Sequence, residues 1–595
     1  MSTSSTTPRT RRVEVHAPHA PRDEEILTPA ALEFLGELDD EVAGRREELL
    51  RARRERRRRI GAGTERLDFR RETQWIRDDR TWSVPPAPAD LRDRRVEITG
   101  PPTRKMTVNA LNSGAQGWMA DFEDATTPTW RAVVEGQLNL VDALERRIDF
   151  TAEDGRRYEL GEEPATIHVR PRGWHLVEKH LWLDGQPLPA GVVDAGLYLF
   201  HCARRQLARG SGPYLYLPKL ESAAEAGLWH DVLCRAEDLL GLARGTVRVT
   251  VLVETLPAAF EMEEILHALR PHATALNAGR WDYLFSTIKT FSADPHQRVL
   301  PDRSALTMDV PFMRAYTELL VRTCHRRGAH AIGGMAAFVP DRSDPERTAR
   351  ALEKVRADKE REATAGYDGS WVAHPGLVGT CREVFDTACD GRPNQLNRRR
   401  CDVTVTAADL LDLASVPGRP TAEGLRTGIA VALRYLQAWL AGSGAVTVDS
   451  LMEDAATVEI VRSQVWQQIR TRARLDDGSV VCAEGVRELV DAEAARMVAA
   501  GTAGEHLGDA VELFLQVSTS AEFIPFFTGL AYSRHVAHPL PGPAPTGHRE
   551  PEPAPEPAPA PEPEVAQVPA PGQAADLREV PLRLPEPVTG AVLQR

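Results

Sequence analysis

The architecture of the chain can be inferred from two short stretches, VRVTVLVE at residues 247–254 and ATALN at residues 273–277. Both are largely apolar runs of strand length, and the segment between them is long enough for a helix. Apolar runs that alternate with helical segments are typical of parallel strands buried on both faces of a sheet. The two stretches therefore predict an α/β fold made of repeated strand–helix units.

The same alternation of apolar runs and helical segments continues on either side, over residues 115–400. Eight runs of this kind occur there: Trp118–Asp121, Ala165–Arg170, Gly196–His201, Tyr214–Lys219, Val247–Glu254, Ala273–Asn277, Ala329–Met335 and Ser370–His374. Eight strand–helix units predict a closed (β/α)8 TIM barrel.

The flanking segments have other patterns. Residues 1–22 are polar and predicted to be disordered, whereas Ile26–Ile60 has apolar residues at helical spacing. Residues 401–535 are predicted to form a compact helical domain. The Pro-rich segment 536–595 is too poor in large apolar residues to offset its ordering entropy, so we expect a disordered tail. It could act as a spacer or as a ligand for a proline-binding partner, and we favour the spacer.

Composition excludes several classes of protein. The 595 residues include 73 Lys and Arg against 86 Asp and Glu, a formal net charge of −13, which argues against general nucleic-acid binding. No apolar run is long enough to cross a membrane, and the first residues lack the apolar region of a secretory signal. Seven scattered cysteines without a CxxC pair indicate reduced thiols, so we expect a cytoplasmic protein.

One basic run needs its own explanation, because seven of the nine residues in Arg51–Arg59 are arginine. It could be a solvated helix face, partly balanced by Glu47, Glu48 and Glu55, or a nucleic-acid patch. Interleaved aromatic residues and a surrounding basic domain would support the second interpretation, and both are missing from the sequence. We therefore predict a solvated helix face.

Polar residues follow seven of the eight predicted strands. They are Asp121, Glu123 and Asp124, then Arg170, His201, Lys219, Glu254, Asn277 with Asp282, and His374. The carboxyl ends of barrel strands converge on one mouth, where barrel enzymes have their active sites. The pattern therefore predicts a catalytic site at this mouth.

Three groups in this set suggest particular chemistry. Glu254 and Asp282 follow successive strands and suit a hard divalent cation such as Mg²⁺, although Asp282 could equally cap a helix and Glu254 could pair with a lysine. Arg170, before Pro171, could present a rigid fork to a carboxylate or a developing oxyanion. Arg172 competes for that role, and either arginine could instead form a structural salt bridge.

The helical segment contributes an acidic pair, Glu453 and Asp454, in LMEDAAT. Such a pair at a helix start usually caps the helix, but Asp454 could also be a general base delivered to the barrel mouth. The sequence contains neither a GxxxxGK[ST] loop nor a convincing GxGxxG motif, which argues against a nucleotide-hydrolysing or Rossmann enzyme.

The sequence resembles a known protein family. From about residue 27 to residue 532 the chain is similar to the malate synthases of the shorter A type. The resemblance is carried, in order, by ITGPPTRKM, MADFEDATTPTW, VRPRGWHL, VLVETLPAAFEMEEILHALR, LNAGRWDYLFSTIKTF, GGMAAFVP, WVAHPGL and LMEDAAT. It implies a TIM barrel (residues 115–400) with an N-terminal helical clasp (23–114) and a C-terminal helical domain (401–535) that plugs the mouth.

The resemblance also implies an activity and its residues. The family condenses acetyl-CoA with glyoxylate and hydrolyses the thioester, giving malate and CoA. By similarity, Glu254 and Asp282 match the Mg²⁺ ligands, Arg170 the catalytic arginine and Asp454 the catalytic base. Substrate-binding positions expected by similarity are Arg170, Gly279, Trp281 and Asp282. We also expect Glu123 and Asp124 to hold metal-bound waters or to orient Arg170, and the segments 333–335 and 374–376 either to line the pantetheine path or to form tight turns.

Two other interpretations stay open. A lyase of the malyl-CoA or citryl-CoA type would share the barrel and metal site but leave the thioester intact, and a silent scaffold would use its Pro-rich tail to recruit partners. The length of the chain and LMEDAAT favour the synthase, as do Glu254, Asp282, Arg170 and Asp454. We expect glyoxylate and acetyl-CoA as small-molecule partners, neither nucleic acid nor membrane, and a monomer.

Overall fold

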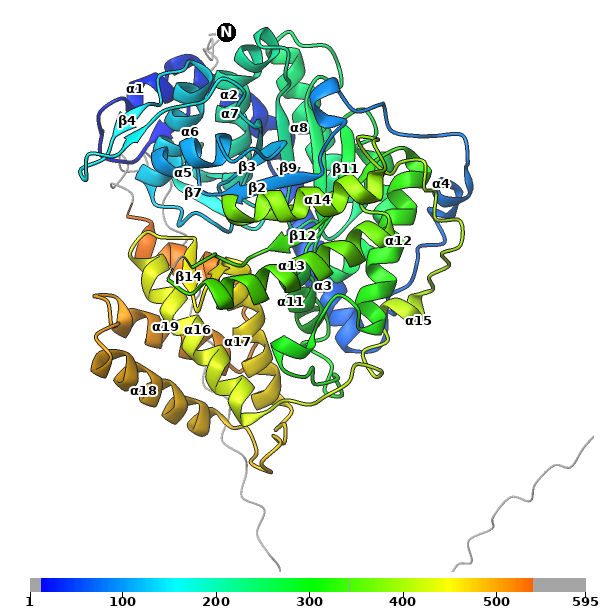
Figure 1. The fold of residues 1–595 in the computed structure, drawn as a ribbon, viewed down its shortest axis with the longest axis vertical. Helices are drawn as coiled ribbons and strands as arrows, with labels where there is room; N and C mark the ends of the chain where they lie inside the picture. The colour runs from blue at the N-terminus through cyan, green and yellow to red at the C-terminus, as the bar shows by residue number, and fades with distance from the viewer. Residues whose placement is uncertain (1–11, 342, 539–595) are drawn as a thin grey trace, which may run out of the picture. The chain divides into compact units, whose positions relative to one another are not determined.

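Eight parallel strands close into a barrel in the computed structural model, which describes residues 12–341 and 343–538 (Figure 1). Around the barrel the order is β2 (Val96–Gly100), β3 (Gly117–Asp121), β6 (Thr166–Arg170), β9 (Tyr214–Leu217), β10 (Arg248–Val253), β11 (Ala273–Ala278), β12 (His330–Ala336) and β13 (Gly369–Val372), which pairs with β2 again. The predicted TIM barrel is confirmed.

Seven of the eight predicted strands coincide with barrel strands, and one is wrong. The run Gly196–His201 lies inside the buried helix α7 (Ala190–Ala208), because a continuous apolar run fits a buried helix as well as a strand. The missing strand is β2, within the range 23–114 that was assigned to the clasp. Its buried Glu97, which accepts a 2.6 Å hydrogen bond from Arg94 inside the barrel, interrupts the apolar pattern.

Helices cover the outside of the barrel. They are α5 (Arg104–Leu111), α6 (Trp130–Leu144), α7, α8 (Ala223–Leu239), α9 (Leu256–Ala259), α10 (Met262–Ala268), α11 (Arg280–Thr290), α12 (Pro311–Arg327), α13 (Pro345–Ala365) and α14 (Val378–Cys389). The largest apolar core lies between these helices and the strands. A smaller core fills the barrel itself and includes Met119, Tyr216, Leu252, Ile332 and Trp371. The interior is therefore packed, which leaves the mouth as the place for chemistry.

The N-terminal segment lies against the barrel helices. Two helices, α2 (Pro29–Val42) and α3 (Arg45–Gly61), replace the single helical stretch predicted for Ile26–Ile60, and the chain bends between them at Gly44, whose φ is +78°. Helix α2 packs on α7 and α8. Short helices α1 (Asp23–Ile26) and α4 (Gln74–Asp78) lie before and after this pair.

Small antiparallel pairs lie outside the barrel. Strand β1 (Glu14–Val15) pairs with β7 (Val177–Leu183), which also pairs with β8 (Gln186–Pro189). The prediction of disorder over residues 1–22 is therefore wrong for β1, while residues 1–11 lie outside the described residues. The pair β4 (Phe150–Thr151) and β5 (Arg157–Tyr158) forms a second small sheet.

The arginine-rich run forms part of α3, and several of its members pair with carboxylates of other elements. Arg53 pairs with Glu225 of α8, while Arg56 lies 2.8 Å from Glu65 and 3.4 Å from Glu261. These partners come mainly from outside α3, and not from the neighbouring glutamates that were expected to balance the charge. Part of the run therefore ties α3 to the rest of the fold.

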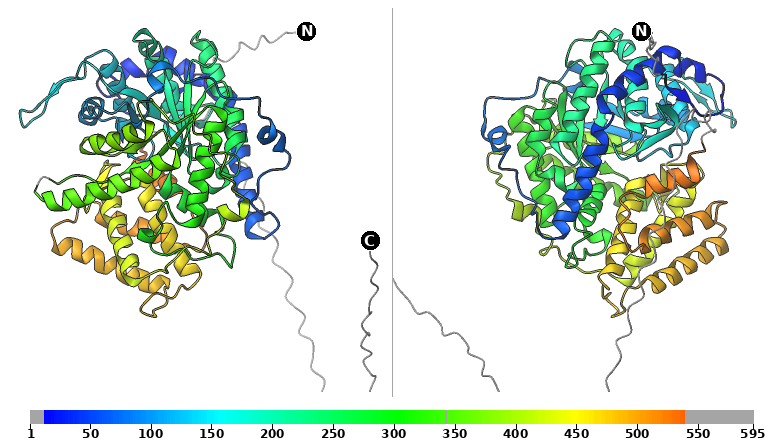
Figure 2. Two further views of the ribbon diagram at one scale, coloured as in Figure 1. Left: turned by 45° about the vertical axis from the view of Figure 1, so that its right-hand side comes forward. Right: turned by 180° about the vertical axis from the view of Figure 1, so that it is seen from behind.

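The C-terminal segment forms a helical domain with its own core. Its elements are α16 (Ala422–Leu440), the hairpin β14 (Val446–Val448) and β15 (Leu451–Glu453), then α17 (Ala455–Arg470), α18 (Ala483–Ala499), α19 (Leu507–Thr519) and α20 (Phe527–Ala531). The preceding short helix α15 (Ala407–Leu410) instead packs on the barrel helix α12, and its Leu410 belongs to the barrel core. The yellow and orange helices gather at one side of the barrel in all views (Figures 1 and 2). The predicted tail falls almost entirely on residues 539–595, outside the described residues.

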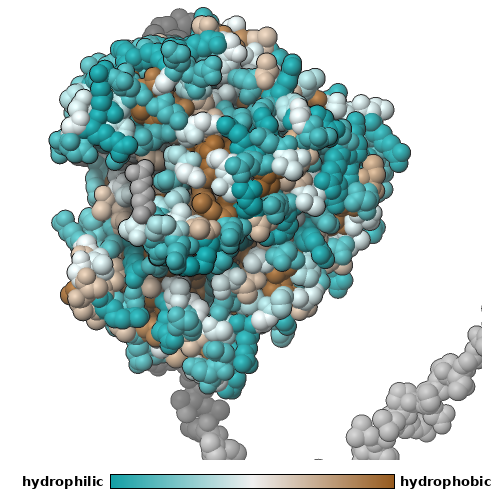
Figure 3. All heavy atoms as spheres, viewed as in Figure 1, coloured by the Kyte–Doolittle hydropathy of each residue, from teal (hydrophilic) through white to brown (hydrophobic). Residues whose placement is uncertain are grey.

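Close contacts join this domain to the loop after β3. Thr127 donates a 2.8 Å hydrogen bond to the carbonyl of Trp439, and a Cβ at Gly444 would come within 2.6 Å of the Ala125 backbone. The domain is therefore seated directly on the end of a barrel strand. The face in Figure 3 is mostly hydrophilic with small apolar patches. Among residues 12–341 and 343–538, none of the helices has the length and apolarity needed to cross a bilayer.

Candidate active site

Four buried carboxylates surround one ammonium group at the barrel mouth. The Nζ of Lys219 lies 2.9 Å from Asp124, 3.0 Å from Glu123, 3.3 Å from Asp282 and 3.9 Å from Glu254. These side chains follow β3, β9, β10 and β11, so the strand ends bring together residues that are up to 159 positions apart in the sequence. The predicted convergence of Glu123, Asp124, Glu254 and Asp282 is confirmed.

Arg170, at the end of β6, is held beside this cluster by Asp121. Its Nε donates a 2.7 Å hydrogen bond to Asp121, and its Nη2 donates a second one to the other oxygen of the same carboxylate. Asp121 in turn accepts backbone N–H groups of Glu123 and Ala125, at 3.0 and 2.8 Å. The remaining nitrogen, Nη1, lies 3.3 Å from Asp124. The guanidinium is thus fixed in advance, with one edge turned toward the carboxylates.

Asp454 reaches the same mouth from the C-terminal domain. It is the N-cap of α17, where it accepts a 3.1 Å hydrogen bond from the N–H of Ala456. The N–H of Ala455, the residue that follows Asp454, donates a 3.3 Å hydrogen bond to the carbonyl of Asp124. Its neighbour Glu453 bonds to Thr457 and lies 3.4 Å from Arg303. Asp454 therefore both caps its helix and lies near the carboxylate cluster, so the two roles considered for it are compatible.

The electrostatic environment gives these acids different proton affinities. Burial and the charge of Asp124 raise the pKa of Glu123 well above its usual range, and burial raises that of Asp282 in the same way. Burial would also raise the pKa of Asp124, but Lys219 and Arg170 lower it below its ordinary value. Burial, reinforced by the charge of Asp124, raises the pKa of Asp454 to about 7. Among these acids, Asp454 therefore combines a pKa near neutrality with a partly exposed side chain, as a general base requires.

The donor set fits a hard divalent cation. Within the described residues, Oδ1 of Asp282 and Oε1 of Glu123 are buried and lack a hydrogen-bond partner. Glu254 uses Oε1 to accept the backbone N–H of Lys219 at 2.9 Å, and a Cβ at Gly279 would lie 3.1 Å from its Oε2. A larger residue at position 279 would therefore displace the side chain of Glu254. Mg²⁺ is usually bound by one or two carboxylates together with several waters, and Glu254 and Asp282 can provide the two carboxylates.

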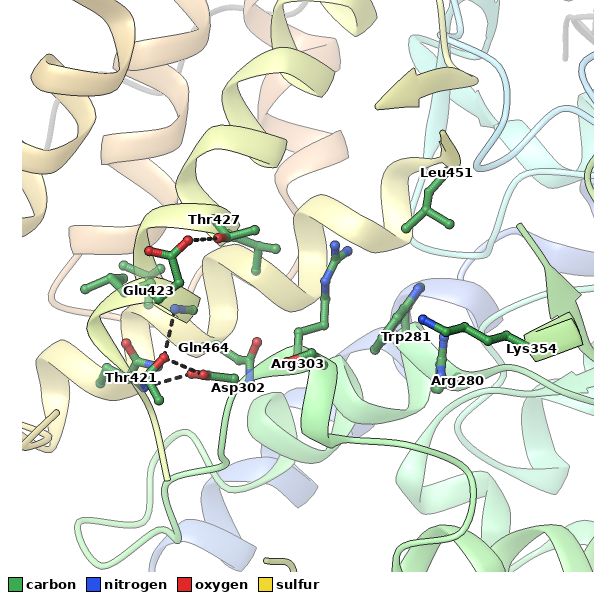
Figure 4. Close-up of a pocket in the computed structure, with 17 residues that line it drawn as sticks. Arg280, Trp281, Asp302, Arg303, Lys354, Thr421, Glu423, Thr427, Leu451 and Gln464 are labelled. Carbon is green, nitrogen blue, oxygen red and sulfur yellow. Dashed lines mark hydrogen bonds between the residues drawn. The ribbon is translucent and has the colours of Figure 1, made fainter. Parts of the chain in front are cut away.

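Gly279 and Trp281 lie at the start of α11, which begins directly beside Glu254. Gly279 is the N-cap and provides no side-chain cap, so the first N–H groups of α11 are available to an anion. Trp281 lines a cavity of about 600 Å³ between the barrel and the C-terminal domain. Figure 4 shows the cationic residues Arg280, Arg303 and Lys354 on the barrel side of this cavity and Thr421 and Gln464 on the helical side.

Other predicted positions have structural roles. Arg172 forms a bidentate pair with Asp194 at 2.8 Å and lies 2.9 Å from Glu178, so its guanidinium group is engaged in a buried salt bridge. His201 is far from a strand end because it belongs to α7, where its Nε2 lies 2.8 Å from the carbonyl of Ile26. His374 caps a short 3-10 helix at Gly376.

Asn277 donates to the carbonyl of Gly333 at 3.1 Å, which joins two neighbouring strands. The residue that sequence reasoning left without a role is Lys219. Its position after β9 was visible in the sequence, but its four carboxylate neighbours come from three other strand ends. Arg280, Arg303 and Lys354 were also missed, because arginines and lysines on helices are common on any protein surface.

Comparison with known proteins agrees with this geometry. Family descriptions match three consecutive parts of the chain: "Malate synthase, N-terminal domain" at residues 11–75, "Malate synthase, TIM barrel domain" at 166–413 and "Malate synthase, C-terminal" at 419–535. The chain belongs to the malate synthase family. The TIM barrel match begins at β6, after the first two strands of the closed barrel.

Individual malate synthases are similar over nearly their whole length. The malate synthase of Streptomyces clavuligerus is 56% identical over 532 residues, which cover 88% of this chain and 98% of the relative. That of Myxococcus xanthus is 52% identical over 515 residues, covering 85% and 94%. Malate synthase A of Escherichia coli is 48% identical over 518 residues, covering 86% and 96%.

Proposed function

We propose that the chain is a malate synthase that condenses acetyl-CoA with glyoxylate and hydrolyses the thioester to give malate and CoA. The observation that carries the proposal is the meeting of Arg170, Asp454, Glu254 and Asp282 at one mouth, although they come from three strands and a separate domain. Membership of the family supports the same activity.

Asp454 is proposed to take a proton from the methyl group of acetyl-CoA. Its raised pKa makes it a stronger base than an exposed aspartate, and its position at the N-cap of α17 holds the carboxylate in place. Negative charge then develops on the thioester oxygen. Arg170, whose Nε and Nη2 are occupied by Asp121, offers the N–H groups of Nη1 to that oxygen.

The carbanion carbon then forms a bond to the aldehyde carbon of glyoxylate, and water later splits the thioester and releases the CoA thiol. The start of α11, with Gly279 and Trp281, is proposed to hold the glyoxylate carboxylate through the first backbone N–H groups of the helix. These begin at Arg280, because the N–H of Gly279 donates to the hydroxyl of Tyr316 at 3.2 Å. Glu254 and Asp282 would hold Mg²⁺, with Glu123 and Asp124 nearby for its bound waters. When bound, the ion would polarise the glyoxylate carbonyl as a Lewis acid.

The cavity beside Trp281 is proposed to receive the CoA part of the substrate. Arg280, Arg303 and Lys354 place positive charge along it, which suits the phosphates of CoA, and Leu451 adds an apolar surface two residues before the acidic pair. The segments 333–335 and 374–376 remain candidates for the pantetheine path. All seven cysteines are free thiols, which supports the expected reducing, cytoplasmic environment. We also keep the proposal of a monomer.

The test is the release of free CoA thiol from acetyl-CoA and glyoxylate, with and without Mg²⁺. We expect release that requires both glyoxylate and the metal and that Asp454→Asn abolishes. Accumulation of malyl-CoA without free thiol would replace the proposal with a lyase that leaves the thioester intact. A folded protein without turnover under any of these conditions would support a catalytically silent scaffold.

A further inference from the structure

A second group of metal-binding side chains lies outside the barrel mouth. His230 and Cys234 are one turn apart on α8, and His272 immediately precedes β11. One ligand atom from each of the three residues lies within 4.8 Å of the other two. His272 is fully buried, and the other two side chains are partly exposed, so an ion could enter from solvent.

The geometry points to a binding site for a borderline transition-metal ion of the Zn²⁺ class, held by His230, Cys234 and His272. The Nδ1 atoms of the two histidines are 3.4 Å apart, and the sulfur of Cys234 lies 3.8 Å from Nδ1 of His230. Ligand atoms on a tetrahedral zinc ion lie about 3.4 to 3.6 Å apart, given bonds of about 2.1 Å to nitrogen and 2.3 Å to sulfur. Small side-chain movements would complete the geometry, with water as the fourth ligand.

Glu237 supports this assignment because it orients His272. Its Oε2 lies 3.2 Å from Nε2 of His272, so a proton on Nε2 leaves the lone pair of Nδ1 directed at His230. Glu237 is itself held by the backbone N–H groups of Val247 and Gly245, at 2.9 and 3.1 Å. A carboxylate that binds the outer nitrogen of a metal-ligating histidine is the usual companion of zinc sites.

This site is separate from the carboxylate cluster in both place and chemistry. His272 precedes β11, whereas Gly279 and Asp282 follow it, so the length of the strand, roughly 20 Å, lies between them. Imidazole and thiolate ligands select Zn²⁺ and Co²⁺ over Mg²⁺, whereas the carboxylates at the mouth prefer the harder ion. The site would link α8 to the barrel strand behind it. Binding would release the thiol proton of Cys234 to solvent.

The experiment is a titration of the full-length, reduced protein with Co²⁺, in excess Mg²⁺ that occupies the carboxylate cluster. We expect one equivalent of Co²⁺ to produce the visible bands of a tetrahedral ion and a near-ultraviolet thiolate-to-cobalt band, both removed by Zn²⁺. Cys234→Ser should abolish the thiolate band, and Glu237→Gln should weaken Co²⁺ binding about 10- to 100-fold. Cys401→Ser, which changes an exposed cysteine elsewhere, is the matched control and should leave the spectrum unchanged.

Because His272 is buried, its variants could fail to fold, so His230→Ala provides the second ligand test at a partly exposed position. It should remove the tetrahedral bands while the protein keeps its circular dichroism spectrum. The proposal is overturned if saturating Co²⁺ produces no thiolate band in the wild-type protein. It is equally overturned if the band persists in Cys234→Ser or the tetrahedral bands persist in His230→Ala.

Discussion

Replacing Lys219 with methionine is expected to destabilise the metal-free protein and to increase its response to Mg²⁺. The substitution removes the single ammonium group that lies within 2.9 to 3.9 Å of four buried carboxylates. One such contact at 3 Å is worth roughly 5 kcal/mol at an effective dielectric constant of 20. Protonation of the carboxylates and water entry reduce the net cost, so we expect a loss of about 3–5 kcal/mol in the free energy of unfolding.

The sign of the pH dependence follows from the same contacts. Without Lys219, the pKa of Glu123 and Asp282 rises further in the folded protein and that of Asp124 is no longer lowered by the ammonium, while in the unfolded chain each pKa stays at its ordinary value. The folded state then binds more protons, so the stability of Lys219→Met should fall as the pH rises from 6 to 8. Added Mg²⁺ should restore more stability to the variant than to the wild type, because the ion replaces the missing positive charge.

The assay is urea unfolding at pH 6 and pH 8, with and without Mg²⁺. Lys289→Met is the matched control, since Lys289 is also buried but pairs with one carboxylate, Glu221 at 2.9 Å, away from the cluster. This control should lose stability without gaining a larger Mg²⁺ response. Equal stabilisation of Lys219→Met and wild type by Mg²⁺ would refute the idea that the ammonium and the cation share the same carboxylates.

Three further outcomes are expected. The acidic limb of the profile of kcat/KM against pH should have its midpoint near 7, because Asp454 is a base only after it loses its proton. A value of kcat/KM that stays constant from pH 5.5 to 8 would contradict this role. Gly279→Ala should lower kcat about 100-fold in the thiol-release assay, because the new Cβ would lie 2.9 Å from the Cβ of Glu254 and displace that carboxylate. Gly508→Ala is the control, since Gly508 has open space around it, and this variant should keep the wild-type kcat. Lys354→Met should raise the KM for acetyl-CoA about two- to fivefold, as expected for one exposed charge, without changing the KM for glyoxylate; equal changes in both constants would remove Lys354 from the CoA cavity.

Much of the barrel could be predicted because its strands are buried on both faces and therefore stand out as apolar runs. The exceptions have physical reasons. Strand β2 contains Glu97, which receives hydrogen bonds from Arg94 and from the distant Tyr216 inside the folded barrel, so its burial could not be seen in the sequence. The run Gly196–His201 lies in a helix that is buried nearly all round, and such a helix has no polar face to reveal its period.

For the candidate site, the sequence by itself determined which residue types stand at the ends of the seven correctly predicted strands, because the polar residue after each strand is a local property. It also provided Asp454 as a helix cap. Only the tertiary structure decided which of two arginines faces the mouth, since Arg172 is bound by Asp194 and Glu178 while Arg170 is held toward the cluster by Asp121. Lys219 acquired its four partners in the same way, because electrostatic interactions depend on distances in space, and closure of the barrel sets those distances.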